Sequence, residues 1–244
     1  MKKLIVIALS VFAVSPALAA DGSWMDPYLA MRVSYIFLDV SGGQDVYLAP
    51  GGVLGPKIAD ERFNIDRGHG FGAKFAFGGD ANIPRIFGRL RIEAEYANNG
   101  SFVIPVASEG GEITFEAQNT TIFGNAYYSV NTGSWWAPYI GAGAGVSHFT
   151  ANVGFSSGSF NAQMSSSEYK FGWQVGAGLS MNLTRGVMVD LGYRFSDLGK
   201  FVSDIDIHQW AAPGTNVTNS IVMRNNVDMN FKSHEIVLGI RYML

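Results

Sequence analysis

Eight segments of the sequence alternate between apolar residues and polar or small ones. The clearest is 89–96, RLRIEAEY, in which every odd-numbered residue is charged and every even-numbered residue is apolar. The other segments are 28–37, 70–78, 120–130, 138–147, 171–183, 187–195 and 234–244. A period of two residues is that of a β-strand, and a tilted strand of about ten residues can cross a membrane. The pattern therefore predicts an all-β chain of eight strands.

The connections between these segments alternate in length. Short connections occupy 79–85, 131–137 and 182–186, and long ones about 41–66, 98–113, 150–168 and 197–229. An even number of strands with short turns at one end and long loops at the other is typical of outer-membrane barrels. We therefore expect an eight-stranded antiparallel transmembrane β-barrel of up-and-down topology. It should have short periplasmic turns and four long extracellular loops, which would be unusual in a compact soluble domain.

Residues 1–20 have the pattern of a secretory signal peptide. Lys2 and Lys3 precede an apolar stretch at 4–14, and Ala17-Leu18-Ala19 supplies a small-residue cleavage site. Residues 21–244 would then form one outer-membrane barrel domain. The chain has no cysteine, which excludes thiol catalysis and thiolate metal sites. A net charge of -3 without a long basic run argues against nucleic acid as a partner.

The direction in which the charged face points decides between two kinds of barrel. A soluble barrel fills its interior with the apolar face, whereas a membrane barrel turns that face towards lipid. The polar faces of 138–147 and 171–183 are rich in glycine, which weakens a strand and has no advantage on a surface facing water. Small residues on some walls and long charged ones on others suit a narrow lumen. We therefore expect the charges inside and the apolar face in lipid.

This orientation predicts a network of ion pairs in the lumen, because an unpaired buried charge is very costly. The cations of the charged face are Arg32, Lys74, Arg89, Arg91, Arg194 and Arg241, and its anions are Glu93, Glu95, Asp190 and Glu235. We also expect Tyr28, Tyr96, Tyr128 and Tyr193 to face lipid as part of an interfacial aromatic girdle.

Four motifs resemble those of the opacity-type outer-membrane proteins, a family of eight-stranded barrels that includes porin-like surface proteins. They are PYIGAGAGVS at 138–147, WQVGAG at 173–178, LGYRFSDLG at 191–199 and EIVLGIRYML at 235–244. The resemblance implies a barrel in the outer membrane of a Gram-negative bacterium, with lipid around it. Members are often surface antigens or adhesins, so it also implies an extracellular or host-surface ligand held by the loops.

Three functions stay open on the sequence. The favoured one is a plugged barrel whose loops serve adhesion or recognition, with Trp210 as a possible contact anchor, although that ring could instead pack on the barrel rim. The alternative is a small-solute porin, which is less favoured because eight strands leave an interior just wide enough for side chains. The third is a lipid-modifying enzyme.

The histidines and acids near the expected rim do not form a recognisable active site. His69 and His148 have no nucleophile fixed within hydrogen-bond reach by the pattern, and Asp204 with Asp206 supplies too few ligands for Ca²⁺. No catalytic residue, cofactor or metal site is therefore predicted, and we expect no enzymatic activity.

Overall fold

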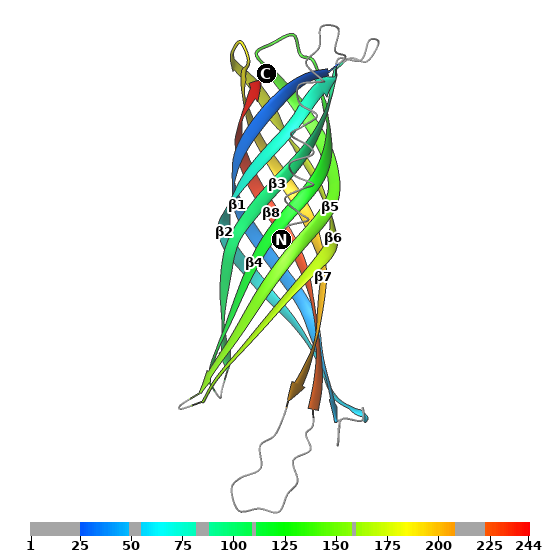
Figure 1. Ribbon diagram of the computed structural model, residues 1–244, viewed down its shortest axis with the longest axis vertical. Coiled ribbons are helices and arrows are strands. Elements are labelled where there is room, and N and C mark those ends of the chain that lie inside the picture. The colour runs from blue at the N-terminus through cyan, green and yellow to red at the C-terminus, as the bar shows by residue number, and fades with distance from the viewer. Residues whose placement is uncertain (1–24, 49–54, 82–87, 109–110, 158–159, 208–222) are drawn as a thin grey trace, which may run out of the picture.

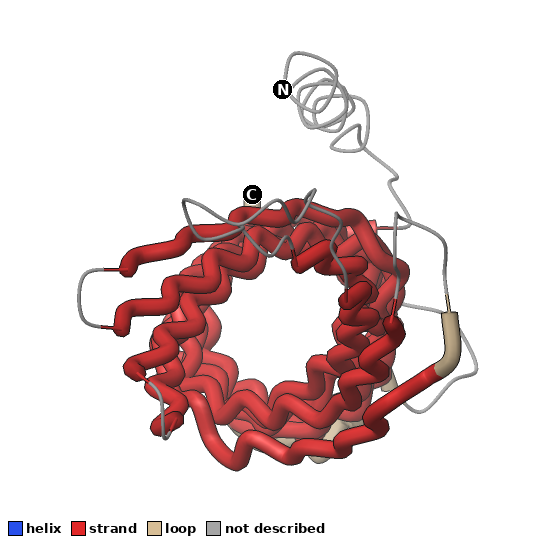
Figure 2. The backbone as a smooth tube through the Cα atoms, turned by 90° about the horizontal axis from the view of Figure 1, so that it is seen from below, coloured by secondary structure: helices blue, strands red, loops and turns tan. Residues whose placement is uncertain are grey.

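The eight strands form one closed antiparallel barrel in which each strand pairs with the next and β8 pairs with β1 (Figure 1). The computed structural model describes residues 25–48, 55–81, 88–108, 111–157, 160–207 and 223–244. The strands are β1 Met25–Leu48, β2 Lys57–Ala81, β3 Arg89–Ser108, β4 Gly111–Ser129, β5 Trp136–Ser157, β6 Phe160–Thr184, β7 Val187–Ile207 and β8 Met223–Met243. Figure 2 shows the ring of strands along the barrel axis. Within the described ranges, no helix has the length and apolarity needed to cross a membrane.

The predicted number of strands and their up-and-down order are confirmed, but the prediction of four long loops needs correction. The strands have 19 to 25 residues, so they continue far into the stretches that were expected to be loops. Residues 41–48 and 57–66, for example, belong to β1 and β2 and pair with each other. We call this end of the barrel, where β1–β2, β3–β4, β5–β6 and β7–β8 are joined, the hairpin end, and the opposite end the turn end.

Over the eight alternating segments, the side of each strand that faces outwards is apolar, as predicted. On β8, Ile236 and Leu238 are 52% and 50% exposed, whereas Glu235, which precedes them, and Val237, which lies between them, are buried. The same alternation runs around the barrel and exposes, among others, Met31, Val33, Phe75, Ile92, Ile122, Ile140, Val175, Leu179, Leu191 and Ile240. These residues make a continuous apolar belt that fits the hydrocarbon of a bilayer.

The expectation for Tyr28 is wrong. Its side chain is fully buried inside the barrel and donates a 2.7 Å hydrogen bond to Glu93 Oε2. Tyr28 has the parity of Arg32, and parity decides which way a strand residue points. Tyr96 and Tyr193 do lie on the outer face, where they are about half exposed.

At the hairpin end the barrel divides into two four-stranded sheets. Strands β2 and β3 pair only between Ala73–Ala81 and Leu90–Asn98, and β6 and β7 only between Trp173–Thr184 and Val187–Asp197. All the other neighbouring strands stay paired towards the hairpin end. One sheet is therefore β7-β8-β1-β2 and the other β3-β4-β5-β6, and they diverge at the lower end of the view in Figure 1. We call the two lines of separation the β2–β3 seam and the β6–β7 seam.

A glycine bulge stands at the start of each seam. Gly100 has a φ of 74° and donates its N–H to Asn98 Oδ1 at 3.0 Å, and Gly199 has a φ of 96° and donates to Asp197 Oδ1 at 3.1 Å. The register of β3 with β4 shifts at the first position, and that of β7 with β8 at the second. A bulge bends its strand and increases its twist, so these residues direct β3 and β7 away from β2 and β6.

Replacing either bulge glycine with alanine is expected to destabilise the barrel by about 1–3 kcal/mol, since a Cβ disfavours this left-handed backbone. A Cβ on Gly100 would also lie 2.7 Å from the Phe71 carbonyl oxygen, and one on Gly199 2.8 Å from that of Phe171. Urea unfolding in lipid vesicles measures the change. Gly133→Ala is the control, because Gly133 has a φ of 68° but no atom within 4 Å of its added Cβ. An equal loss in all three variants would contradict a role for the close carbonyl oxygens.

Candidate functional site in the barrel lumen

Ten charged side chains are buried among the described residues, and all of them point into the lumen. They are Arg32 of β1, Lys74 and Asp80 of β2, Arg91, Glu93 and Glu95 of β3, Asp190 and Arg194 of β7, and Glu235 and Arg241 of β8. Five of them are cationic and five are anionic, so the group is neutral as a whole. The described residues of β4, β5 and β6 contribute no buried charged side chain to the lumen.

The centre of this charge network is Glu95, whose carboxylate lies between two arginines. Arg32 Nη1 is 2.7 Å from Glu95 Oε2, and Arg194 Nη1 is 2.6 Å from Glu95 Oε1. Arg32 Nη2 also reaches Glu93 Oε2 at 2.7 Å, and Arg194 Nη2 donates to the Tyr127 hydroxyl at 3.2 Å. Charge-assisted hydrogen bonds of this kind satisfy the carboxylates, which makes their burial tolerable.

Two further groups of ion pairs flank this centre. Towards the hairpin end, Lys74 Nζ is 2.7 Å from Glu235 Oε2. Towards the turn end, Arg241 bridges Asp80 at 3.0 Å and Asp190 at 3.2 Å, and Arg91 reaches Asp190 at 3.4 Å. The charges therefore form a column along the barrel axis.

The structure brings together nine of the ten charged residues that the sequence assigned to the lumen. The exception is Arg89, which is the first residue of β3 and is exposed at the turn end. Asp80 was missed because the expected turn covered 79–85, whereas β2 continues to Ala81. Removing Arg89 and adding Asp80 changes six cations and four anions into five of each.

Glycines on β5, β6 and β7 make room for two tyrosine rings inside the barrel. A Cβ on Gly141 would collide with the Tyr127 ring, and a Cβ on Gly178 or Gly192 would collide with Tyr139. The two rings meet edge to face, with their centroids 5.7 Å apart. The Arg91 guanidinium lies over both rings, 4.2 Å from the centroid of Tyr127 and 5.1 Å from that of Tyr139.

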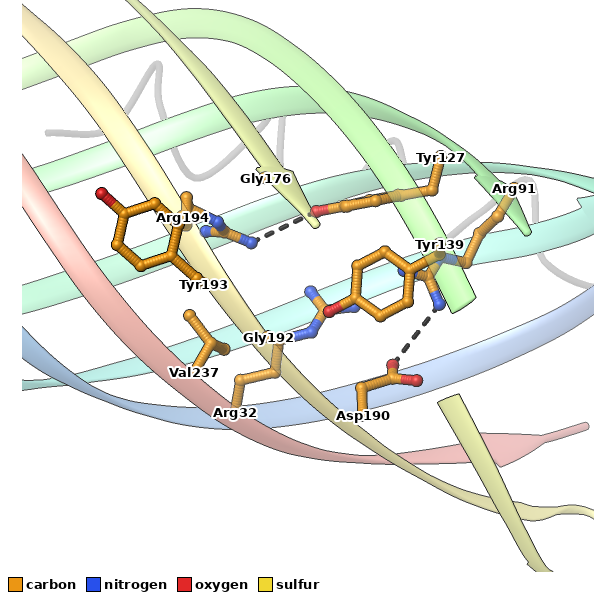
Figure 3. Close-up of a pocket in the computed structure, with 10 residues that line it drawn as sticks. All are labelled: Arg32, Arg91, Tyr127, Tyr139, Gly176, Asp190, Gly192, Tyr193, Arg194 and Val237. Carbon is orange, nitrogen blue, oxygen red and sulfur yellow. Dashed lines mark hydrogen bonds and ion pairs between the residues drawn. The ribbon is translucent and has the colours of Figure 1, made fainter. Parts of the chain in front are cut away.

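A small cavity remains beside these rings (Figure 3). Its lining includes Arg32, Arg91, Tyr139, Asp190 and Arg194, so it is walled by the charge network itself. The remaining wall is glycine, tyrosine and Val237.

Amides fill the lumen next to the charges, on the side of the hairpin end. Asn99 Nδ2 donates to Asn119 Oδ1 at 2.6 Å, and Asn119 Nδ2 donates to Ser147 Oγ at 2.7 Å. Lys74 Nζ connects this layer to the charge network through a 3.3 Å hydrogen bond to Asn99 Oδ1.

An apolar cluster also fills the lumen near the hairpin end. It consists of Ile36, Leu38, Val40, Phe102, Ala117, Phe123, Phe149, Leu198, Met229 and Phe231, all buried. The Phe149 and Phe231 rings stack with their centroids 4.5 Å apart. Sequence reasoning missed this cluster, although the signal was present: Ile36 and Leu38 continue the inward parity of Arg32 on β1.

The histidines and acids considered for catalysis or metal binding do not meet in the lumen. His148 lies towards the outer face, with its Nε2 2.8 Å from Ser167 Oγ, and His69 is exposed. The side chains of Asp204 and Asp206 and the whole of Trp210 lie outside the residues that can be described. The described part of the chain holds no group of three or more histidines, cysteines or acids that could bind a metal.

Comparisons with known proteins agree with this geometry. Residues 4–243 match the model of the outer membrane protein beta-barrel domain. The outer membrane protein PagN of Salmonella typhimurium is 28% identical over 187 residues, which are 70% of this chain and 72% of PagN.

Two solved structures are also similar. The outer membrane protease OmpT of Escherichia coli has a TM-score of 0.51 at 9% identity, with 89% of this chain and 97% of OmpT covered. Neisserial surface protein A has a TM-score of 0.40 at 18% identity, with 86% and 97% covered. The similarity to OmpT is one of fold alone. The family match covers nearly the whole sequence, and the chain therefore belongs to the outer-membrane protein β-barrel domain family and is a protein of the cell outer membrane.

Proposed function

We propose that this protein is a sealed barrel whose two four-stranded sheets at the hairpin end serve as a surface for adhesion or recognition, together with the segments that join their strands. The observation that carries the proposal is the filling of the lumen by charged, amide and apolar layers. A barrel filled in this way has little room for a transported solute, so its function would depend on the parts outside the bilayer. Those parts are the strands that extend beyond the apolar belt and the segments that join them.

Two of the three layers oppose the passage of ions. An ion in the charged layer would have to displace partners of Glu95 or Asp190, and breaking a buried pair typically costs about 3–5 kcal/mol. In the apolar layer, an ion would have to lose its hydration shell beside Phe149 and Phe231, which is how hydrophobic constrictions close channels. Both layers would have to open together for conduction.

The purified protein is therefore expected to be silent in planar lipid bilayers at any applied voltage. The measurement is single-channel recording, with an open porin inserted under the same conditions as the positive control. Steady conductance steps that scale with salt concentration would contradict the sealed barrel and favour the small-solute porin.

Adhesion is tested by expressing the protein in a non-adherent Gram-negative strain and counting the bacteria that bind to cultured epithelial cells. We expect expression to raise binding several-fold and Trp210→Ala to remove a large part of the gain, since buried aromatic anchors often dominate an interface. Trp135→Ala is the matched control, because Trp135 is an exposed tryptophan at the turn end of the barrel. Expression without any gain in binding would contradict adhesion as the function.

A further inference from the structure

We propose that the β6–β7 seam accepts an extended polypeptide segment of a partner protein, which adds to the sheet as a further strand. The inference rests on the proposed function, because it states how a surface-interaction protein of this shape would hold its partner. The occupant is a protein strand, and not a lipid or a glycan.

The first observation is the length of the edges that line this seam. Pairing between β6 and β7 stops at Trp173 and Asp197, yet β6 extends from there to Phe160 and β7 to Ile207. Over 160–172, β6 pairs with β5, and over 199–207, β7 pairs with β8. Each strand is therefore hydrogen-bonded to a neighbour on the side away from the seam. Each of these edges is longer than an ordinary strand of about 5–6 residues.

The second observation is the backbone chemistry of such an edge. In an antiparallel sheet, alternate residues direct their N–H and C=O groups to opposite sides, so a strand with one neighbour presents a row of donors and acceptors on its other side. Only another extended polypeptide repeats donors and acceptors with the same spacing. This is the basis of recognition by strand addition.

The third observation is that no proline interrupts either edge of this seam, whose other protection consists of charged residues such as Lys170 and Lys200 and the bulge at Gly199. Natural edges are commonly shortened or interrupted by proline. The β3 edge of the other seam carries Pro105, whereas 160–172 and 198–207 contain no proline. Proline therefore interrupts one edge of the β2–β3 seam and neither edge of the β6–β7 seam.

The fourth observation is that the separation is built into the sequence at two places. The motifs Asn98-Asn99-Gly100 and Asp197-Leu198-Gly199 make the same turn, with a left-handed glycine whose N–H binds the side chain two residues before it. Both turns begin at the last residue pair before the strands separate, which is Ala73 with Asn98 at one seam and Trp173 with Asp197 at the other. Bulges are typically retained where they serve a purpose, and these two hold the edges apart.

Side chains on the outer face of β6 would add to the contact. Tyr169 and Phe171 are 60% and 70% exposed and lie next to the open edge. Aromatic residues are favourable partners for β-branched residues on a neighbouring strand. An incoming strand with apolar β-branched residues at alternate positions would fit this face.

The test uses the full barrel in lipid nanodiscs and a nine-residue synthetic peptide of alternating Thr and Val. The control peptide has Pro in place of every Thr, so it cannot form a regular ladder. Amide hydrogen exchange is followed by NMR. With the Thr-Val peptide, alternate amides of 160–172 or of 199–207 are expected to exchange at least about tenfold more slowly, as amides do when they enter a ladder. The Pro peptide should change nothing, and neither peptide should affect β4, which has a neighbour on both sides.

A pair of variants locates the contact on β6. Ser166 and Ser167 are adjacent, so only one of them directs its N–H to the seam and the other directs it to β5. If the peptide protects β6, either Ser166→Pro or Ser167→Pro should abolish that protection while leaving the barrel as stable as before. Retention of the protection in both variants would overturn the assignment to β6 and, with β7 unchanged, the inference itself.

Three other results would overturn the inference. They are equal effects of the two peptides, full protection of both edges without peptide, and protection that rises with protein concentration, which would assign the seam to a second copy of this chain. Bacterial adhesion is measured separately. Strong adhesion with no response to the Thr-Val peptide would overturn the seam inference alone, whereas absence of adhesion would contradict the proposed function whatever the peptide does.

Discussion

Glu95→Gln is expected to destabilise the barrel by about 3–5 kcal/mol, because it leaves two buried arginines without their shared anion. The Glu95 side chain is 1% exposed and lies within 2.7 Å of both Arg32 and Arg194. Glu93 can compensate only Arg32, with which it is already paired. Urea unfolding in lipid vesicles, followed by tryptophan fluorescence, measures the change in the free energy of unfolding.

Lys200→Met provides the control for this prediction. Lys200 pairs with Asp228 at 2.9 Å, but its side chain is 58% exposed, and surface ion pairs contribute about 0–1 kcal/mol. A second comparison adds Arg194→Met to Glu95→Gln. The double variant should lose less than the sum of the two single losses, because removing Arg194 also removes one of the uncompensated charges. If Glu95→Gln costs no more than Lys200→Met, the network does not stabilise the barrel.

Leu238→Arg is expected to destabilise the barrel by about 2–4 kcal/mol, the cost of an arginine on the lipid face near the middle of a bilayer. Leu238 is the middle member of the outward row of β8, between His234 near the hairpin end and Tyr242 near the turn end. The same vesicle unfolding experiment measures the loss.

Val202→Arg is the matched control for this substitution. Val202 is 41% exposed, similar to Leu238 at 50%, but it lies on β7 beyond the start of the seam. A charge there should meet water, and the change should stay within about 0.5 kcal/mol. Equal effects at the two positions would contradict a bilayer around the apolar belt.

The sequence predicts the number of strands and their faces because lipid imposes a strict contrast between the two sides of a strand. Beyond the belt both sides meet water or the other sheet, so the contrast disappears. For this reason the alternation predicts loops at 57–66 and 99–108, although their backbones continue the ladders. The same uncertainty at strand ends misplaced Arg89 and Asp80.

The partners within the lumen could not be predicted from the sequence. Arg91 meets Asp190, and Glu95 meets Arg194, but β3 and β7 are not neighbours in the sheet. Such pairs depend on the tilt and stagger of all the strands between them, which the alternation does not specify. Tyr28 shows the opposite case, since its inward position follows from parity alone and was obscured by the preference of tyrosine for membrane interfaces.

The direction of the two strand faces is tested most directly by NMR of the methyl-labelled protein in lipid nanodiscs. Nuclear Overhauser effects from lipid acyl chains are expected at the methyl groups of Ile236, Leu238 and Ile240 and absent at those of Val237, which is 5% exposed and lies inside. Lipid contacts at Val237 without contacts at its three neighbours would contradict the account, because the charged face would then be the one that meets the bilayer.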